Sequence, residues 1–311
     1  MFRNLSTTAL GISGTPNEMI EMALSYGFKS VDLDVVDFAR QVELRGLPHS
    51  RRLLDSAKLG LGSFPLPIAW EVEDAEFKAE LEKLKPLAEL ARELNCLRTT
   101  LIIAPASDER PYHQNFEFHR RRLAELGAAL EPFGIALGVG FLAPDHHRQG
   151  KSFEFLHGLE ALNMLLAMLG RKNVGLALDV WHLHVSGGGL ESIRKLLGSQ
   201  IVTVTLADAP ADMTAEDARE ESRLLPGETG TIDAPAILSL LAELDYDGPV
   251  TVAPDPSQLA GLRRDELVKR VGQSLDAAWK AAGLNPDGKL SPQLGATAVS
   301  AVLNAASIPH G

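Results

Sequence analysis

The chain has 311 residues, of which 45% are hydrophobic and 23% charged, an ordinary globular composition with ample material for a core. Its net charge of −11, with no block of Lys or Arg, argues against nucleic acid as a partner. The single cysteine, Cys96, excludes a disulfide framework and indicates a reducing compartment. The N-terminal residues lack the apolar run of a signal peptide, and no stretch reaches the ~20 apolar residues of a membrane span. We therefore expect a cytoplasmic protein without a membrane partner.

Short apolar runs alternate with longer helical patterns along the chain. The first helix is the best marked, because Thr15 as N-cap and Glu18 three residues later form a capping box, and Gly27 supplies the stop. The predicted strands are 7–13, 30–36, 59–66, 97–105, 135–144, 173–181, 200–208 and 249–256. The main predicted helices are 15–27, 49–60, 74–94, 115–130, 152–169, 190–198, 233–248 and 264–281.

Eight strand–helix units predict a parallel sheet covered by helices. Eight of them in so short a chain fit a closed (β/α)8 TIM barrel better than an open, doubly wound sheet. No G-x-G-x-x-G follows the first predicted strand, so a dinucleotide site has no support. The remaining segment, 284–311, is predicted to be a C-terminal extension, either a docked helix or a contact in a homo-oligomer.

The active site of such a barrel lies at the carboxyl ends of its strands. The polar side chains at these predicted ends, and in the loops that follow, are Asp32, Asp34, Asp37, His146, His147, Asp179, His182, His184, Thr205, Asp208, Arg223, Glu228 and Asp255. Asp179 and His182 form the most suggestive pair, because Asp-x-x-His at the mouth of a strand could supply half of a metal site. The question is whether the other half is present.

Four segments carry a recognisable pattern: "FGIALGVGFLAP", "VGLALDVWHLHVSGG", "IVTVTLAD" and "RLLPGETGTIDAPAILSLLAELDYDGPVTVAP". Together they resemble the sugar phosphate isomerase/epimerase family, the xylose-isomerase-like barrels. The resemblance is most specific over 173–256 and covers most of 7–283. It implies one barrel domain over 1–283 that binds a small carbohydrate-like molecule.

The resemblance also implies a divalent metal at the top of the barrel. Family members hold it with a Glu ending strand five, an Asp ending strand six, a His in strand seven and a Glu ending strand eight. In the epimerases the two Glu residues also transfer the substrate proton, while the ion polarises the carbonyl. In this chain these four positions fall at Gly140, Asp179, Thr205 and Ala253.

Three of those four ligands are therefore replaced, and we expect no metal cofactor at this place. The substrate-contacting positions are better preserved, as His182 and Arg223. We predict catalytic roles for Asp179 and His182 and substrate contacts from Arg223, His146 and Trp181. The simpler alternatives are that Asp179 is an inherited polar group and that Arg223 forms an ion pair with Glu221 or Glu228.

Weaker candidates follow from the same strand ends. His184 is expected to be a wall or loop residue. Trp70 and Trp181 could each stack on a sugar ring, with Trp181 the better candidate for the pocket wall. The glycines of 186–193 are more often plain loop than an anion cradle. A metal site rebuilt from relocated ligands would use Asp179, His182, Asp208 and Asp255.

Three functions remain open from the sequence. The first is a carbohydrate- or polyol-binding barrel that has lost the usual metal and Glu/Glu chemistry. The second is a divergent isomerase or lyase that uses Asp179, His182 and Arg223 without metal, and the third is an enzyme with relocated metal ligands. A DNA-repair nuclease on the same fold has less support, because it needs more His and Glu ligands and the charge is wrong for DNA.

Overall fold

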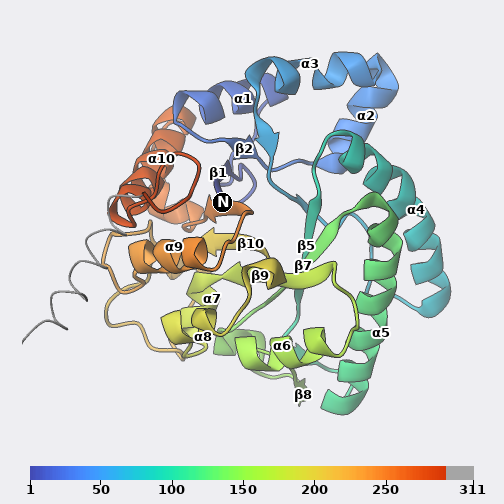
Figure 1. Ribbon diagram of the computed structural model, residues 1–311. Helices are drawn as coiled ribbons and strands as arrows, with labels where there is room; N and C mark the ends of the chain where they lie inside the picture. The colour runs from blue at the N-terminus through green and yellow to red at the C-terminus, as the bar shows by residue number, and fades with distance from the viewer. Residues whose placement is uncertain (292–311) are drawn as a thin grey trace, which may run out of the picture.

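The computed structural model describes residues 1–291, apart from the side chains of Pro16, Asn17 and Leu53. Within this range a parallel sheet is surrounded by helices (Figure 1). Its strands are β1 (Phe2–Leu5), β2 (Ser30–Val31), β3 (Gly60–Leu61), β4 (Phe64–Pro65), β5 (Arg98–Ile103), β7 (Ala136–Phe141), β9 (Val174–Asp179), β10 (Ile201–Leu206) and β11 (Pro249–Val252). The helices are α1 (Pro16–Ser25), α2 (Val35–Arg45), α3 (Leu47–Ala57), α4 (Asp74–Glu93), α5 (Tyr112–Leu130), α6 (Leu159–Ala167), α7 (Val180–Val185), α8 (Leu190–Arg194), α9 (Ala234–Glu243) and α10 (Arg264–Ala281).

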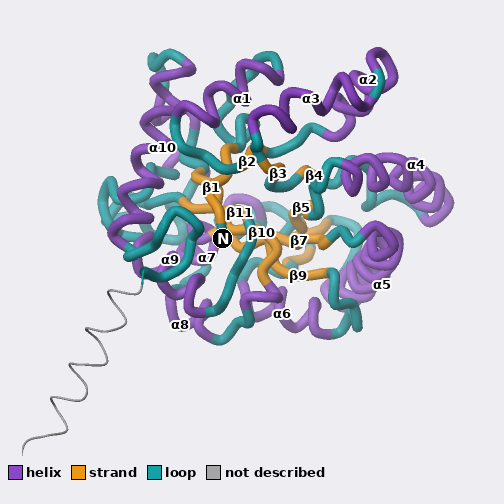
Figure 2. The backbone as a smooth tube through the Cα atoms, turned by 45° about the horizontal axis from the view of Figure 1, so that its top comes forward, coloured by secondary structure: helices purple, strands orange, loops and turns teal. Residues whose placement is uncertain are grey.

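The sheet closes at its third strand. Its hydrogen-bonded order is β3-β2-β1-β11-β10-β9-β7-β5-β4, and β3 and β4, at opposite ends of that order, are separated in sequence only by Gly62 and Ser63. On one side the amide of Gly62 donates to Val31 (2.9 Å), and on the other the amide of Leu66 donates to Thr100 (2.8 Å). β3 and β4 are thus two parts of one strand. Residues 1–291 form the expected TIM barrel, and Figure 2 shows its strands gathered inside a ring of helices.

The first strand differs from the prediction over 7–13. β1 pairs with β2 and β11, whereas the amide of Leu10 donates to Thr7 in a turn and Gly11 has a φ of +63°. The reason lies in Asn4, whose buried side chain donates to Thr251 (2.9 Å) inside the barrel. A short strand that carries a buried amide lacks the apolar run by which strands are found in sequence.

Two other segments are shorter than predicted. The second strand ends at Val31, because Asp34 accepts a hydrogen bond from the amide of Asp37 (2.9 Å) and caps α2. The helix predicted over 152–169 begins only at Leu159. Before it, β8 (Phe153–Glu154) pairs with β6 (Ala106–Ser107) as an antiparallel hairpin.

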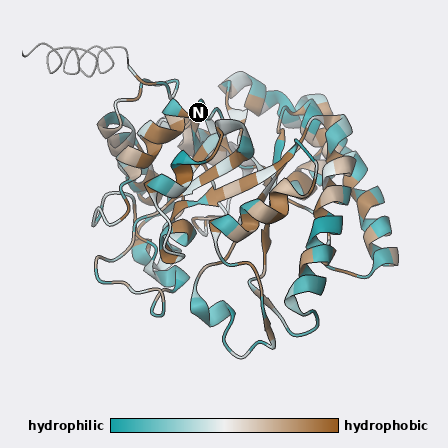
Figure 3. Ribbon diagram, turned by 60° about the horizontal axis from the view of Figure 1, so that its bottom comes forward, coloured by the Kyte–Doolittle hydropathy of each residue, from teal (hydrophilic) through white to brown (hydrophobic). Residues whose placement is uncertain are grey.

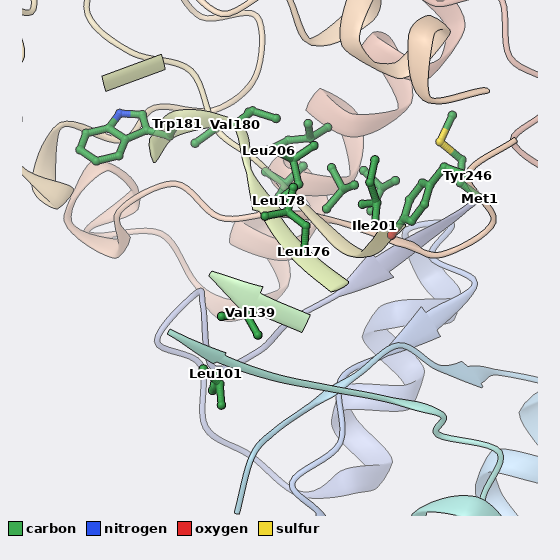
Figure 4. Close-up of a cluster of buried hydrophobic side chains, with 14 of the residues drawn as sticks. Met1, Leu101, Val139, Leu176, Leu178, Val180, Trp181, Ile201, Leu206 and Tyr246 are labelled. Carbon is green, nitrogen blue, oxygen red and sulfur yellow. The ribbon is translucent and has the colours of Figure 1, made fainter. Parts of the chain in front are cut away.

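Alternate strand residues face the helices and the barrel interior. The outward residues are large and buried, and Figure 4 shows Leu101, Val139, Leu176 and Leu178 from three successive strands in one cluster. The positions that alternate with them are small or polar, among them Thr100, Gly138, Ala177 and Asp179. The hydropathy colouring in Figure 3 shows brown strands between helices that are banded teal and brown. The apolar core therefore lies between sheet and helices, and the polar chemistry lies inside the cylinder.

The described chain ends soon after α10. Leu284 and Leu290 form a β-bridge, and the indole of Trp279 donates to the carbonyl of Asn285 (2.8 Å). Residues 292–311, most of the predicted extension 284–311, lie outside the described residues, so the domain boundary after 283 stays a prediction. In the part of the chain that is described, no helix is both long and apolar enough to cross a membrane.

Candidate functional site at the barrel mouth

Asp179 ends β9 and caps α7. Its Oδ1 accepts hydrogen bonds from the amides of Trp181 (2.9 Å) and His182 (3.2 Å), and its Oδ2 accepts one from Nη2 of Arg223 (2.6 Å). Burial raises the pKa of Asp179. The nearby Arg223 and His182 and these hydrogen bonds lower it by a larger amount, so the pKa lies below its ordinary value. The carboxylate is ionised, and both of its oxygens are engaged.

Arg223 joins the ends of two strands at the barrel mouth. Its Nη2 holds Asp179, after β9, while its Nε donates to the carbonyl of Ala253, after β11 (3.0 Å). Only 10% of its side chain is exposed, and its Cζ lies 5.2 Å from the ring centre of Trp181, a cation–π contact. Among residues 1–291 nothing accepts a hydrogen bond from Nη1. One edge of a fixed cation therefore remains for a ligand.

Neither alternative ion-pair partner lies against Arg223 among the described residues. Glu228 lies 3.2 Å from Arg270, and the structure records no ion pair of Glu221 there. Arg223 instead forms its ion pair with Asp179, at the end of β9.

Trp181 supports the guanidinium from the core side. Its side chain is fully buried, at 0% exposure, and its indole nitrogen has no hydrogen-bond partner within the described chain. Figure 4 shows it at the end of the apolar cluster opposite Met1 and Tyr246. A ring so placed cannot touch a ligand directly, so any part that Trp181 has in substrate binding acts through Arg223. That part stays a prediction.

His182, the third residue of α7, is oriented by the loop after β7. Its Nδ1 accepts from the amide of Ala143 (3.4 Å), so the ring proton of the neutral form is on Nε2. Burial lowers the pKa of His182, Asp179 raises it and Arg223 lowers it, and the pKa is below its ordinary value. At neutral pH the imidazole is uncharged, with an Nε2–H that can donate.

Two further positions of the expected metal set lie against this pair. Thr205 on β10 is in register with Asp179 on the neighbouring strand β9. Ala253 accepts through its carbonyl from Arg223 and donates its amide to Leu206 at the end of β10 (2.9 Å). One guanidinium therefore joins Asp179 and Ala253, and Thr205 lies beside Asp179 on the neighbouring strand.

The fourth position, Gly140, lies on β7 beside Ala177, two residues before Asp179 on the same face of β9. A Cβ atom there would lie 3.5 Å from the Cγ1 of Ile102, an ordinary contact. The barrel thus has space for a Cβ atom at Gly140.

The metal set with relocated ligands does not assemble, which corrects that expectation. Asp208 accepts four backbone amides, those of Ala209, Thr229, Gly230 and Ile232. Burial raises the pKa of Asp208, but these amides lower it more, and the pKa lies below its ordinary value. Asp255 accepts from the amide of Ser257 (2.8 Å) and caps a turn. Both carboxylates shape loops instead of joining Asp179 and His182.

A different group of metal-ligating side chains does form. His146 and His147 lie in a short 3₁₀ turn after β7, and both face Glu220. The Nε2–carboxylate distances are 2.7 Å from His147 and 3.3 Å from His146. The sequence indicated His146 as a candidate, but it gave no sign of Glu220, which lies 73 residues after His147 and belongs to no local motif.

The three carboxylates after the second strand belong to a different cavity from Asp179, His182 and Arg223. Asp32 faces the barrel interior, where it accepts from Asn4 (2.8 Å) and from the backbone and hydroxyl of Ser63 (both 3.1 Å). Burial raises its pKa above the ordinary value, although these hydrogen bonds oppose the change. Asp32, Asp34 and Asp37 line a cavity of 570 Å³ between α1, α2 and α3. Asp179, His182 and Arg223 are not part of its wall.

The weaker candidates from the sequence are Trp70, the glycines of 186–193 and His184. Trp70 is largely buried and packs edge-on against His119, with ring centres 5.4 Å apart. Gly189 begins α8, a helix of five residues. His184 lies on α7 and is half-buried.

Comparison with known proteins identifies the family. The model for the xylose isomerase-like TIM barrel matches residues 20–276, and the chain belongs to this family. An inosose isomerase of Bacillus velezensis is 29% identical over 155 residues, which cover 50% of this chain and 52% of that protein. The chain thus spans about half the length of this curated relative.

Solved structures share the fold. A xylose isomerase domain protein from Alicyclobacillus acidocaldarius superposes with a TM-score of 0.82 at 23% identity, covering 91% of this chain and 99% of the other. The IolI protein, solved with a zinc atom, gives 0.75 at 16% identity, covering 91% and 98%. At these identities the likeness concerns the fold alone.

Proposed function

We propose that the chain binds a small polyhydroxy ketone or polyol at the carboxyl end of its barrel, with Arg223 as the fixed cation where relatives hold a divalent metal. The family and the inosose isomerase relative support a carbohydrate-like ligand. One observation carries the specific form of the proposal. The Arg223 guanidinium bridges Asp179 and Ala253, two of the four positions that would surround the ion.

The side chains present do not fit a divalent ion at these four positions. The side chains of Gly140 and Ala253 offer no atom that could ligate a metal ion, and a lone Thr205 hydroxyl is a poor substitute for an imidazole. The remaining carboxylate, Asp179, is already paired with Arg223. A dication beside that guanidinium would also meet like-charge repulsion. We therefore derive no step through a metal at this place.

Two donors are left for the ligand. The Nη1 edge of Arg223 can donate to a carbonyl, hydroxyl or carboxylate oxygen, and its charge strengthens that hydrogen bond. The Nε2–H of neutral His182 can donate to a second oxygen. Asp179 positions both groups, because its carboxylate holds the guanidinium and caps the helix that carries His182. This donor-rich pair suits a compound with oxygens on adjacent carbons.

Titration calorimetry with inososes, ketoses, polyols and sugar acids tests the proposal. Arg223→Gln should weaken binding of the best ligand at least about tenfold, the value of one charged hydrogen bond. Arg219→Gln is the matched control, because Arg219 lies in the same loop and donates only to backbone carbonyls, those of Glu216 and Ala218. Removing metal with EDTA should leave the affinity unchanged. Equal affinity in Arg223→Gln, or binding that requires added metal, would refute the proposal.

A second candidate is catalysis without metal by a divergent isomerase or lyase. The observation that favours it is a buried cation beside a neutral imidazole, an electrophile next to a proton donor. Asp179 is poorly suited as a base because both of its oxygens are occupied. Solvent-deuterium exchange into inososes and ketoses separates the candidates. Exchange that is lost in His182→Ala would favour catalysis, whereas binding without exchange favours a binding protein.

A further inference from the structure

Three metal-ligating side chains meet beside the barrel mouth, apart from the four positions above. One ligand atom from each of His146, His147 and Glu220 lies within 4.8 Å of the others. The two imidazole centres are 4.0 Å apart, and both Nε2 atoms face the same carboxylate. We propose that these three side chains form a binding site for a transition-metal dication, preferably zinc. The inference is independent of the proposed function.

The two histidines are presented by a fixed turn. The amide of His147 donates to Pro144 (3.3 Å), and the amide of Arg148 donates to Asp145 (2.8 Å). The guanidinium of Arg148 donates hydrogen bonds to the carbonyl of Ala143 (2.8 Å) and to the carboxylate of Asp145. The turn is therefore held by backbone and side-chain bonds before any ion binds, which lowers the entropic cost of binding.

Glu220 is held from the opposite loop. Its own backbone carbonyl accepts from the amide of Arg223 (3.1 Å), so the loop that carries the guanidinium also places this carboxylate. The contact with Nε2 of His147 (2.7 Å) orients the carboxylate toward the two imidazoles. A carboxylate is the form in which Glu binds a metal ion.

The ligand chemistry selects the class of ion. Two imidazole nitrogens and one carboxylate oxygen suit zinc and other late first-row metals, whereas Mg²⁺ and Ca²⁺ prefer oxygen alone. Three protein ligands leave one coordination position of a tetrahedral zinc ion for water. The exposed fractions of the side chains, 28%, 28% and 34%, leave a path for the ion from solvent.

The cluster lies one loop away from His182. The amide of Ala143 donates to Nδ1 of His182, and the carbonyl of Ala143 accepts from Arg148, in the turn that carries the histidines. Glu220 and His147 also act on the pKa of His182, in opposite directions. An ion bound here would therefore stand close to the ligand-binding donors without occupying the place of the guanidinium.

Zinc titration of the full, EDTA-treated chain tests the site directly, without any carbohydrate. One equivalent should bind, and His146→Ala, His147→Ala and Glu220→Gln should each weaken binding at least about tenfold. His184→Ala and Glu221→Gln are the matched controls and should bind as wild type does. Titration calorimetry measures both the stoichiometry and the affinity of each variant.

The variant Asp179→Asn distinguishes this site from a ring formed by the four family metal-ligand positions, which are Gly140, Asp179, Thr205 and Ala253. We expect its zinc affinity to equal that of the wild type. Loss of zinc in Asp179→Asn with retention in the three cluster variants would place the ion in the ring and overturn the proposal. Absence of binding at micromolar zinc would overturn it as well. Thermal melts of each variant verify that the fold is intact.

Discussion

At the scale of single residues, the Asp179–Arg223 pair has the largest consequences. With 22% and 10% of their side chains exposed, the two charges are mostly removed from water, so each depends on the other for compensation. Removing one partner leaves an uncompensated charge near the core, whereas removing both does not. Such pairs give structural specificity to a site even when they add little net stability.

The first prediction concerns this pair. Arg223→Gln should lower the free energy of unfolding by about 2 kcal/mol at pH 7, because it leaves the Asp179 carboxylate without its ion-pair partner. The double variant with Asp179→Asn should lose less than the sum of the two single changes. Urea denaturation of the four proteins in the cycle measures this coupling. Strictly additive losses would mean that the two side chains do not interact in solution.

The second prediction concerns Asp32, whose pKa is shifted in the other direction. Its folded pKa is raised by burial, so its contribution to stability is fully present below the unfolded value of about 3.9 and is lost as the pH rises through the folded pKa. Asp32→Asn removes that loss, so the variant should gain stability relative to wild type between pH 4 and pH 8. Denaturation midpoints across this range measure the difference. A constant difference would show that Asp32 titrates normally.

At the scale of elements, the third strand shows how the barrel closes. Its two parts, β3 and β4, meet at Gly62, where a Cβ atom would lie 2.2 Å from Oδ1 of Asn4. That amide cannot move easily, because it also bonds to Asp32, Thr251 and Ser30. The glycine is therefore required by the polar interior of the barrel.

The third prediction follows from this contact. Gly62→Ala should lower the free energy of unfolding by about 1–3 kcal/mol through overpacking against Asn4. Gly189→Ala is the matched control, since a Cβ atom there meets nothing within 4 Å, and it should change stability little. Chemical denaturation of the three proteins provides the test. Equal stability of both variants would show that the interior of the barrel is loosely packed.

Elements with strong local signals could be predicted from the sequence. The helix predicted at 264–281 has the bounds of α10, and the capping box of Thr15 and Glu18 is present, with the Thr15 amide bonded to Glu18 (2.9 Å). The first strand, predicted wrongly over 7–13, shows where local sequence signals fail. β1 is defined by pairing with β2 and β11 and by a buried amide inside the barrel, and neither is a local property.

The site could be predicted in position but not in its connections. The sequence placed Asp179, His182 and Arg223 at one end of the barrel, because parallel strands bring their carboxyl ends to one face. In the structure Asp179 and Arg223 are in contact. The sequence could not show that Arg223 pairs with Asp179, since a loop conformation across 44 positions decides this. The same applies to the approach of Glu220 to His147.

At the scale of the whole molecule, the barrel separates stability from recognition. Its apolar mass lies outside the strands, under the helices, while the interior carries small and polar side chains that can change without loss of the core. The members of such a family can therefore keep the fold and exchange the group that attracts the ligand. In this chain the proposed exchange is a guanidinium for a metal ion.

An anomalous difference map from crystals soaked in Mn²⁺ and a bound inosose or polyol tests that exchange most directly. We expect the Arg223 guanidinium to remain on the Asp179 carboxylate, with a ligand oxygen on its Nη1 edge and no manganese peak bonded to Asp179. A manganese ion coordinated by Asp179, with Arg223 displaced, would contradict it.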